Sequence, residues 1–143
     1  MLTNKDYCDY ETCVALKELG YNRGAYAYYF PNHKEDLIFN THQMRGCSIN
    51  EMLKGYNTYP KDVMGCEFID APTMWEAQKW LREEKKIEVV ILGENEIGGP
   101  YCADIYTEGG YAGYVHKTCV KYEEALLEGI KAAIEILTNN ENE

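Results

Sequence analysis

His116 and Cys119 are the residues whose types and spacing come nearest to nucleophilic chemistry. A cysteine becomes a nucleophile when a neighbouring base or positive charge favours its thiolate. On a helix, two residues three positions apart would share one face and could form a thiolate–imidazole pair. The segment is typical of a loop, however, and no oxyanion-forming motif accompanies it. A small thiol-dependent enzyme using this pair is therefore an alternative function, not the leading one.

Metal ligation lacks a sequence signature. A structural zinc site needs closely paired ligands that converge on one tetrahedron. The nearest cysteines, Cys8 and Cys13, are separated by four residues within or beside a helix, and His33, His42 and Cys47 would converge only through folding. We therefore predict no metal site.

Two glycine-rich stretches resemble phosphate-binding loops only in part. Residues Gly93–Pro100 lack the Lys-Ser/Thr pair of a P-loop, and Glu108–Tyr114 begins with glutamate where a dinucleotide-binding motif requires glycine. Both are predicted to be turns. The sequence thus predicts no cofactor.

Composition restricts the partners and the compartment. The formal charge is −10, from 14 basic and 24 acidic residues, which disfavours nucleic-acid binding by a general basic patch. The first residues lack the apolar region of a signal peptide, and no apolar run is long enough to span a membrane. We expect a cytoplasmic protein with reduced, mostly structural cysteines. The 13 tyrosines suit half-buried sheets and interfaces.

Capping signals and apolar periodicity predict the helices. Asp9 caps the first helix and Gly20 ends it, and Thr73 with Glu76 forms a capping box for another. The expected helices are residues 10–19, a short one at 48–55, residues 73–85 and residues 122–137.

Extended segments alternate with these helices without a repeating βαβ unit. They are expected at residues 24–30, 36–39, 66–70, 87–92 and 101–107, with a weaker one at 114–118. Residues 24–30 and 36–39 are expected to pair across a polar turn at 32–35, and residues 87–92 and 101–107 as an antiparallel hairpin with a long loop. This order favours an α+β fold in which a mainly antiparallel sheet of about four to five strands carries about three helices on one face. We expect a single domain over residues 1–143, with 138–143 as a frayed tail.

The two tryptophans belong to different faces of the predicted helix 73–85. At about 100° per residue, Trp80 borders the apolar stripe, whereas Trp75 lies among Lys79, Arg82 and Lys86. Trp80 is therefore predicted to be core. Trp75 either tucks against a loop near residues 56–60 or anchors a partner, because tryptophan and arginine are enriched at binding hot spots.

The last helix has an apolar arc that exceeds half its circumference. A surface helix needs only about 100° of apolar face, so two burial partners are expected. The sheet should cover the part around Gly129 and Ala133, where small residues permit close approach. Leu127 and Ile134 should contact either the first helix or a second copy, which would give a homodimer.

Segments in both halves of the chain resemble a family of small proteins. The stretches "APT…A.KWLRE" (residues 71–83) and "YEEALLEGIKAAIEIL" (122–137), with "CDYETCVALKELGY" near the amino terminus, are similar to uncharacterised phage and mobile-element proteins of anaerobic gut bacteria. One departure is Lys121, which stands where serine or threonine is usual and makes the start of the last helix uncertain. The resemblance implies an α+β fold and no activity.

The leading hypothesis is therefore a non-enzymatic accessory or interaction protein of phage or mobile-element origin, with an unidentified protein partner. Besides the thiol enzyme, a further alternative is an acidic decoy of a DNA-binding host factor. The decoy would need carboxylates spaced along one surface like phosphates.

Overall fold

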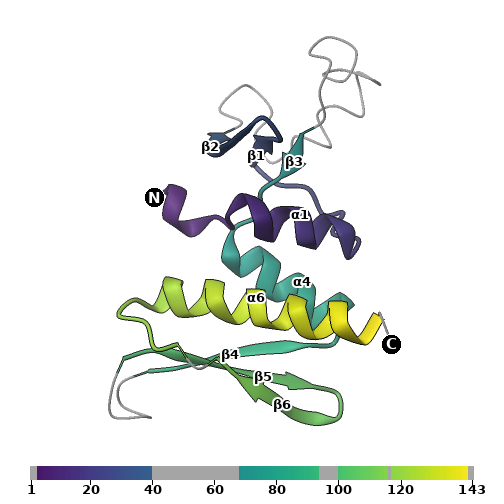
Figure 1. The fold of residues 1–143 in the computed structure, drawn as a ribbon, viewed down its shortest axis with the longest axis vertical. Coiled ribbons are helices and arrows are strands. Elements are labelled where there is room, and N and C mark those ends of the chain that lie inside the picture. The colour runs from purple at the N-terminus through teal and green to yellow at the C-terminus, as the bar shows by residue number, and fades with distance from the viewer. Residues whose placement is uncertain (1–2, 40–67, 94–99, 116, 142–143) are drawn as a thin grey trace. The chain divides into compact units, whose positions relative to one another are not determined.

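A computed structural model describes residues 3–39, 68–93, 100–115 and 117–141. The protein is α+β, as predicted. Its six described strands form two three-stranded antiparallel sheets instead of the single sheet of four to five strands that the sequence suggested. The chain, for which a single domain was expected, is grouped into two compact units, residues 1–73 and 74–143 (Figure 1).

The first unit begins with a short 3₁₀ helix (Asn4–Asp6) and helix α1 (Tyr10–Glu18). Asp9 caps α1, since its side chain accepts a hydrogen bond from the Thr12 backbone N–H at 3.0 Å. Gly20 has a φ of 102°, the left-handed conformation that favours glycine after a helix. The cap and the stop therefore confirm the predicted first helix.

Strands β1 (Ala27–Phe30), β2 (His33–Phe39) and β3 (Ile69–Asp70) form the sheet of this unit in the order β2-β1-β3. The β1–β2 hairpin was predicted, but β2 begins at His33 and not at Asp36, so the turn contains only Pro31 and Asn32. Tyr29 is buried and donates a hydrogen bond from its hydroxyl to the Cys8 carbonyl at 3.1 Å. The helix predicted at residues 48–55, like His42, Cys47, Cys66 and residues 56–60, lies outside the described residues.

The second unit has the order α4 (Met74–Glu84), β4 (Glu88–Leu92), β5 (Cys102–Thr107), β6 (Gly110–Tyr114) and α6 (Tyr122–Glu141). The antiparallel pairing of β4 with β5 confirms the predicted hairpin. The third strand, however, was misplaced: it begins at Gly110 immediately after a turn at Glu108–Gly109, and not at Tyr114. Most of the segment Glu108–Tyr114, which was predicted to be entirely turn, is therefore strand.

Helix α6 begins at Tyr122, which resolves the uncertainty about its start, and continues beyond Leu137. Residues 138–141 are helical where a frayed tail was expected, and the Thr138 hydroxyl donates to the Ile134 carbonyl at 2.8 Å. Among the described helices, α6 included, none combines the length and apolar character needed to cross a membrane.

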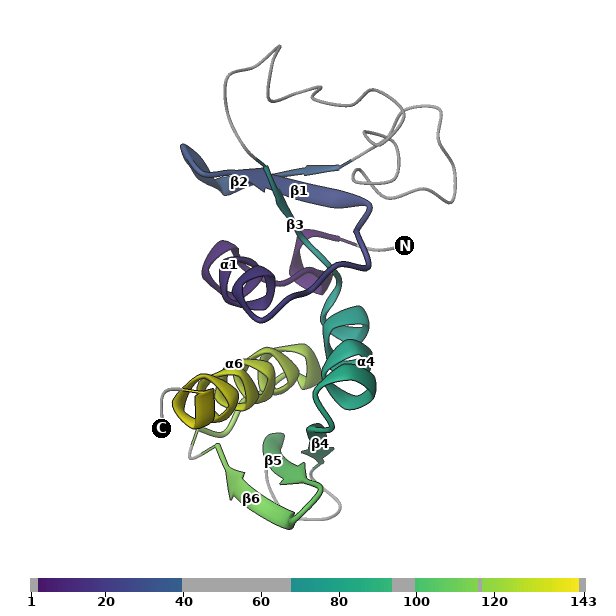
Figure 2. The same cartoon turned by 90° about the vertical axis from the view of Figure 1, so that its right-hand side faces the viewer.

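Helix α6 packs across one face of the β4-β5-β6 sheet, with α4 beside it (Figures 1 and 2). Gly129 permits this close approach, because a Cβ atom built there would lie 2.5 Å from Val89 Cγ1 and 2.9 Å from the Ala103 Cβ. The sheet therefore covers the part of α6 that the sequence analysis assigned to it. No described element of this unit packs on the opposite face of the sheet.

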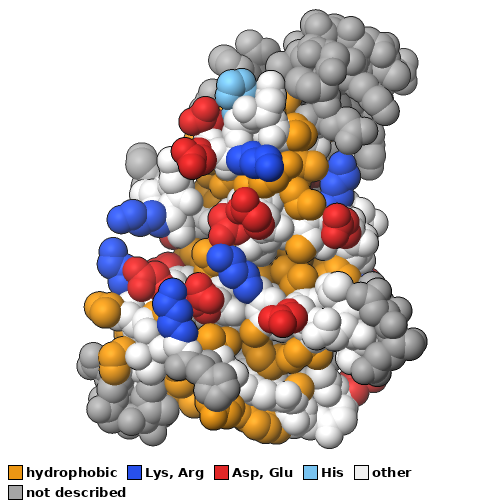
Figure 3. All heavy atoms as spheres, in the orientation of Figure 1, with side chains coloured by type: hydrophobic (Ala, Val, Ile, Leu, Met, Phe, Trp, Pro, Cys, Tyr) orange, Lys and Arg blue, Asp and Glu red, His pale blue; other side chains and the backbone are white. Residues whose placement is uncertain are grey.

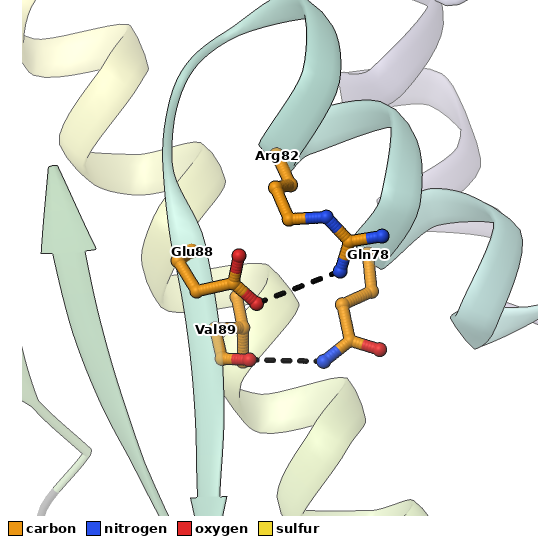
Figure 4. Close-up of polar contacts among 4 residues, drawn as sticks. All are labelled: Gln78, Arg82, Glu88 and Val89. Carbon is orange, nitrogen blue, oxygen red and sulfur yellow. Dashed lines mark hydrogen bonds and ion pairs between the residues drawn. The ribbon is translucent and has the colours of Figure 1, made fainter. Parts of the chain in front are cut away.

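Helix α4 also protects one edge of this sheet (Figure 4). β4 is an edge strand, and the Gln78 side-chain amide donates to the Val89 carbonyl at 2.9 Å. One turn later, Arg82 Nη1 lies 3.7 Å from Glu88 Oε1. Side chains of α4 thus occupy an edge that would otherwise be open to pairing with another strand.

Candidate functional site

The candidate site is the face of the β4-β5-β6 sheet that points away from α6. Successive side chains of a strand point to opposite faces, and Val89, Ala103 and Ile105 are buried on the α6 side. The intervening residues of β4 and β5 therefore face away from the helix. Together with two tyrosines of β6 they form what we call the tyrosine face, which comprises Glu88, Val90, Leu92, Cys102, Asp104, Tyr106, Tyr111 and Tyr114.

A β-bulge places both β6 tyrosines on this face. Tyr114 pairs with Asp104 and Tyr111 pairs with Tyr106, although the β6 residues are three apart and the β5 residues only two. Ala112 is the extra residue. Because directly opposed residues share a face, Tyr111 and Tyr114 both join Asp104 and Tyr106.

The three tyrosines are exposed: Tyr106 is 38%, Tyr111 is 56% and Tyr114 is 55% accessible. The rings of Tyr106 and Tyr111 pack edge-to-face with centroids 5.5 Å apart, which fixes these two aromatic groups relative to one another. In the lower part of Figure 3, hydrophobic side chains reach the surface over the strands of this sheet. The face thus offers exposed aromatic area on a regular, hydrogen-bonded support.

Asp104 provides the negative charge within this aromatic surface. Partial desolvation and, after it, the negative charge of Asp104 raise the pKa of the Tyr111 phenol, in keeping with the position of both residues on the same face. No described lysine or arginine forms an ion pair with Asp104. The other carboxylate, Glu88, lies at the edge of the face and is paired with Arg82.

The predicted partner surface on α4 is only partly available. Trp80 is buried at 2% and Trp75 is exposed at 38%, as predicted. Among the three basic residues, Arg82 pairs with Glu88, and Lys86 lies beyond the end of α4 with its ammonium group 2.8 Å from the Glu83 carbonyl. Lys79 is exposed. Binding of a partner at Trp75 remains a prediction.

Cys119 lies in a setting that disfavours a thiolate. It is 3% exposed and forms an isolated bridge with Tyr101, with backbone hydrogen bonds of 2.8 Å in both directions. Burial raises the pKa of the Cys119 thiol; Lys117 opposes this effect, and Glu124 and Glu128 add to it. His116 lies outside the described residues.

The remaining cysteines and histidines form no metal-binding group in the described part of the chain. Cys8, Cys13 and Cys119, half of the six cysteines, are buried, as expected for structural residues. Within residues 3–39, 68–93, 100–115 and 117–141, no three cysteine, histidine or acidic side chains are grouped so that they could hold a metal ion. His33 is exposed, and its Nδ1 atom lies 3.7 Å from Asp36 Oδ2.

The predicted self-association residues differ in their availability. Ile134 is 6% exposed within a single copy of the chain, whereas Leu127 is half-buried. Helix α4 packs against α6 in the same unit and is therefore one of its burial partners. Leu127 is the more exposed of the two residues, and the homodimer stays a prediction.

No family model matches this chain, and neither curated proteins nor solved structures gave a significant match. Sequence reasoning did not single out Asp104, Tyr106, Tyr111 or Tyr114. The signal that pointed towards them was the abundance of tyrosine, a residue that suits sheet surfaces and interfaces.

Proposed function

We propose that the protein is a non-enzymatic accessory protein of phage or mobile-element origin that binds another protein through the tyrosine face. The observation that carries this proposal is the group of three exposed tyrosines on one side of a sheet whose other side is covered by α6. Tyrosine gives large contact area at a low cost in conformational entropy, and it is enriched in protein interfaces. An exposed aromatic group of this kind commonly marks an interaction site.

The support beneath these residues favours binding by a preformed surface. All three strands are paired along their length, and α6 packs on the reverse side. A partner therefore need not order the backbone of this face when it binds, which removes one entropic cost of association. The raised pKa of the Cys119 thiol favours this function over the thiol-dependent alternative.

Affinity capture from the native host, with the full chain as bait, tests the proposal. The double substitution Tyr111→Ser and Tyr114→Ser should reduce recovery of the partner at least about tenfold, because hot-spot aromatics each contribute 2 kcal/mol or more. The matched control is Tyr26→Ser, since Tyr26 is also exposed (44%) but lies before β1 in the other unit. Undiminished capture by the double variant would contradict the proposal. Loss of capture by Trp75→Ala alone would show that the binding surface is on α4.

A further inference from the structure

We propose that the tyrosine face binds an arginine side chain of its partner, with the guanidinium group over the Asp104 carboxylate and beside the surrounding tyrosine rings. This inference rests on the proposed function, because it names the chemistry that the same face recognises. It is carried by three observations: the position of Asp104 among the tyrosines, the charge of the face, and the geometry of the possible cations.

Asp104 is near the middle of the tyrosine group. Tyr114 is its direct cross-strand partner, and Cβ atoms of such pairs are about 4.5–5.5 Å apart. Tyr106 is two residues along the same strand, roughly 7 Å away. Tyr111 is opposite Tyr106 and hence diagonal to Asp104, and Asp104 contributes to its raised pKa. A group placed over the carboxylate would therefore be within reach of all three rings.

The charge of the face favours a cation. Its eight residues include two carboxylates and no lysine or arginine. Glu88 is already paired with Arg82, whereas no described lysine or arginine pairs with Asp104. The whole chain has a formal charge of −10, which would attract a positively charged partner over longer distances. An anionic or purely apolar partner would leave Asp104 desolvated without compensation.

Arginine fits this arrangement better than lysine does. Its planar guanidinium group can donate two parallel hydrogen bonds to one carboxylate while its faces stack on aromatic rings. The edge-to-face pair of Tyr106 and Tyr111 presents rings in two orientations. A cation near such rings is attracted by their electron-rich faces, and more strongly when water is excluded. A lysine ammonium group is more strongly hydrated and makes only a point contact.

The test uses a small probe and the full chain. N-acetyl-arginine amide is titrated into the ¹⁵N-labelled protein, and the backbone amide shifts are followed. The neutral and nearly isosteric N-acetyl-citrulline amide is the matched probe, and N-acetyl-lysine amide tests the choice of cation. We expect saturable shifts at residues of β5 and β6 with the arginine probe, with a Kd in the millimolar range, and at least about tenfold weaker binding of citrulline, because hydrogen bonds to charged groups contribute about 1.5–3 kcal/mol.

Substitution of Asp104 provides a second test of the arginine assignment. Asp104→Asn should equalise the affinities for the arginine and citrulline probes. Glu108→Gln removes the same charge from the neighbouring β5–β6 turn and should preserve the difference. Both positions are on the surface side of the hairpin, and retention of the wild-type amide spectrum confirms that each variant folds. Equal affinities for the two probes in the wild type, shifts confined to other elements, or tighter binding of the lysine probe would overturn the inference.

The proposed function and this inference fail in different ways. If capture of the partner depends on Tyr111 and Tyr114 but is unaffected by Asp104→Asn, the tyrosine face binds a protein and the arginine assignment is wrong. If capture is insensitive to the tyrosines, the proposed function fails as well. Loss of capture with Asp104→Asn and not with Glu108→Gln supports both.

Discussion

Gly129 of α6 lies so close to Val89 of β4 that there is no room for a side chain at position 129. A Cβ atom on Gly129 would lie 2.5 Å from Val89 Cγ1 and 2.9 Å from the Ala103 Cβ, distances at which one of the elements must move. Ile130 and Ala133 of the same helix are also buried. The glycine therefore sets the separation at which α6 packs, and the helix in turn holds the reverse side of the tyrosine face.

Gly129→Ala should destabilise the protein despite the higher helix propensity of alanine. The propensity gain is roughly 1 kcal/mol, whereas overpacking a core costs typically 1–3 kcal/mol. We expect a net loss of up to about 2 kcal/mol in the free energy of unfolding, measured by urea denaturation. A gain in stability would show that the helix and the sheet separate at little cost.

A double-mutant cycle isolates the contact. Val89→Ala removes the nearest atoms, so Gly129→Ala should cost less in that background than in the wild type, with a coupling of about 0.5–3 kcal/mol. Additive effects of the two substitutions would locate the cost of Gly129→Ala elsewhere in α6.

The tryptophans of α4 provide a second test of packing. Trp80 is 2% exposed and Trp75 is 38% exposed, although they are only five residues apart. Trp80→Ala should therefore lower the free energy of unfolding by about 3–5 kcal/mol, as expected for an emptied large core site. Trp75→Ala should cost much less. Urea denaturation followed by circular dichroism compares the two variants, and equal losses would contradict the assignment of Trp80 to the core.

The helices were predictable because their signals are local. Asp9 and Gly20 are adjacent to the helix that they delimit, and the wide apolar arc of α6 required a sheet against Gly129. Local signals do not determine how strands are grouped. The division of the six described strands into two sheets depends on which strands pair, and β3 pairs with β1 across some forty residues of sequence. A single sheet was therefore a reasonable but wrong expectation.

The tyrosine face was missed for a physical reason at Ala112. Strand periodicity places residues i and i+2 on one face, so Tyr111 and Tyr114 would be assigned to opposite faces. The bulge inserts one residue and brings them to the same face. Gly110 and Gly113 have φ values of 108° and 155°, which glycine adopts readily. Because glycines are also typical of turns, the same residues led to the prediction of a turn for this segment.

Cys119 should react slowly with alkylating reagents. It is buried, and its thiol pKa is raised, so little thiolate is present at neutral pH. Iodoacetamide labelling at pH 7, read by mass spectrometry, should modify Cys119 at least about tenfold more slowly in the folded protein than in urea. Cys102, which is only half-buried, serves as an internal comparison. Labelling of Cys119 faster than in the unfolded chain would restore the thiol-enzyme alternative.

Asp70 is a described residue of the first unit through which pH should act on stability. It lies at the end of β3, and burial raises the pKa of its carboxyl group from 3.8 to about 7, while Lys17 of α1 partly opposes this effect. Between these pH values the folded protein holds a proton that the unfolded chain releases. Because stability falls with pH wherever the folded state binds more protons, the free energy of unfolding should decrease from about pH 4 to about pH 7 and change little above it.

Asp70→Asn tests this linkage, since asparagine keeps the shape of the carboxyl group without its charge. The wild type should lose stability relative to Asp70→Asn as the pH rises through this window, by at most about 1.4 kcal/mol per pH unit. Urea denaturation between pH 5 and pH 8 measures the difference. Glu35→Gln, at an exposed carboxylate of β2, is the control and should keep the wild-type slope. If Asp70→Asn keeps that slope too, Asp70 ionises in the folded protein near its ordinary pKa, and the loss of stability originates at another group.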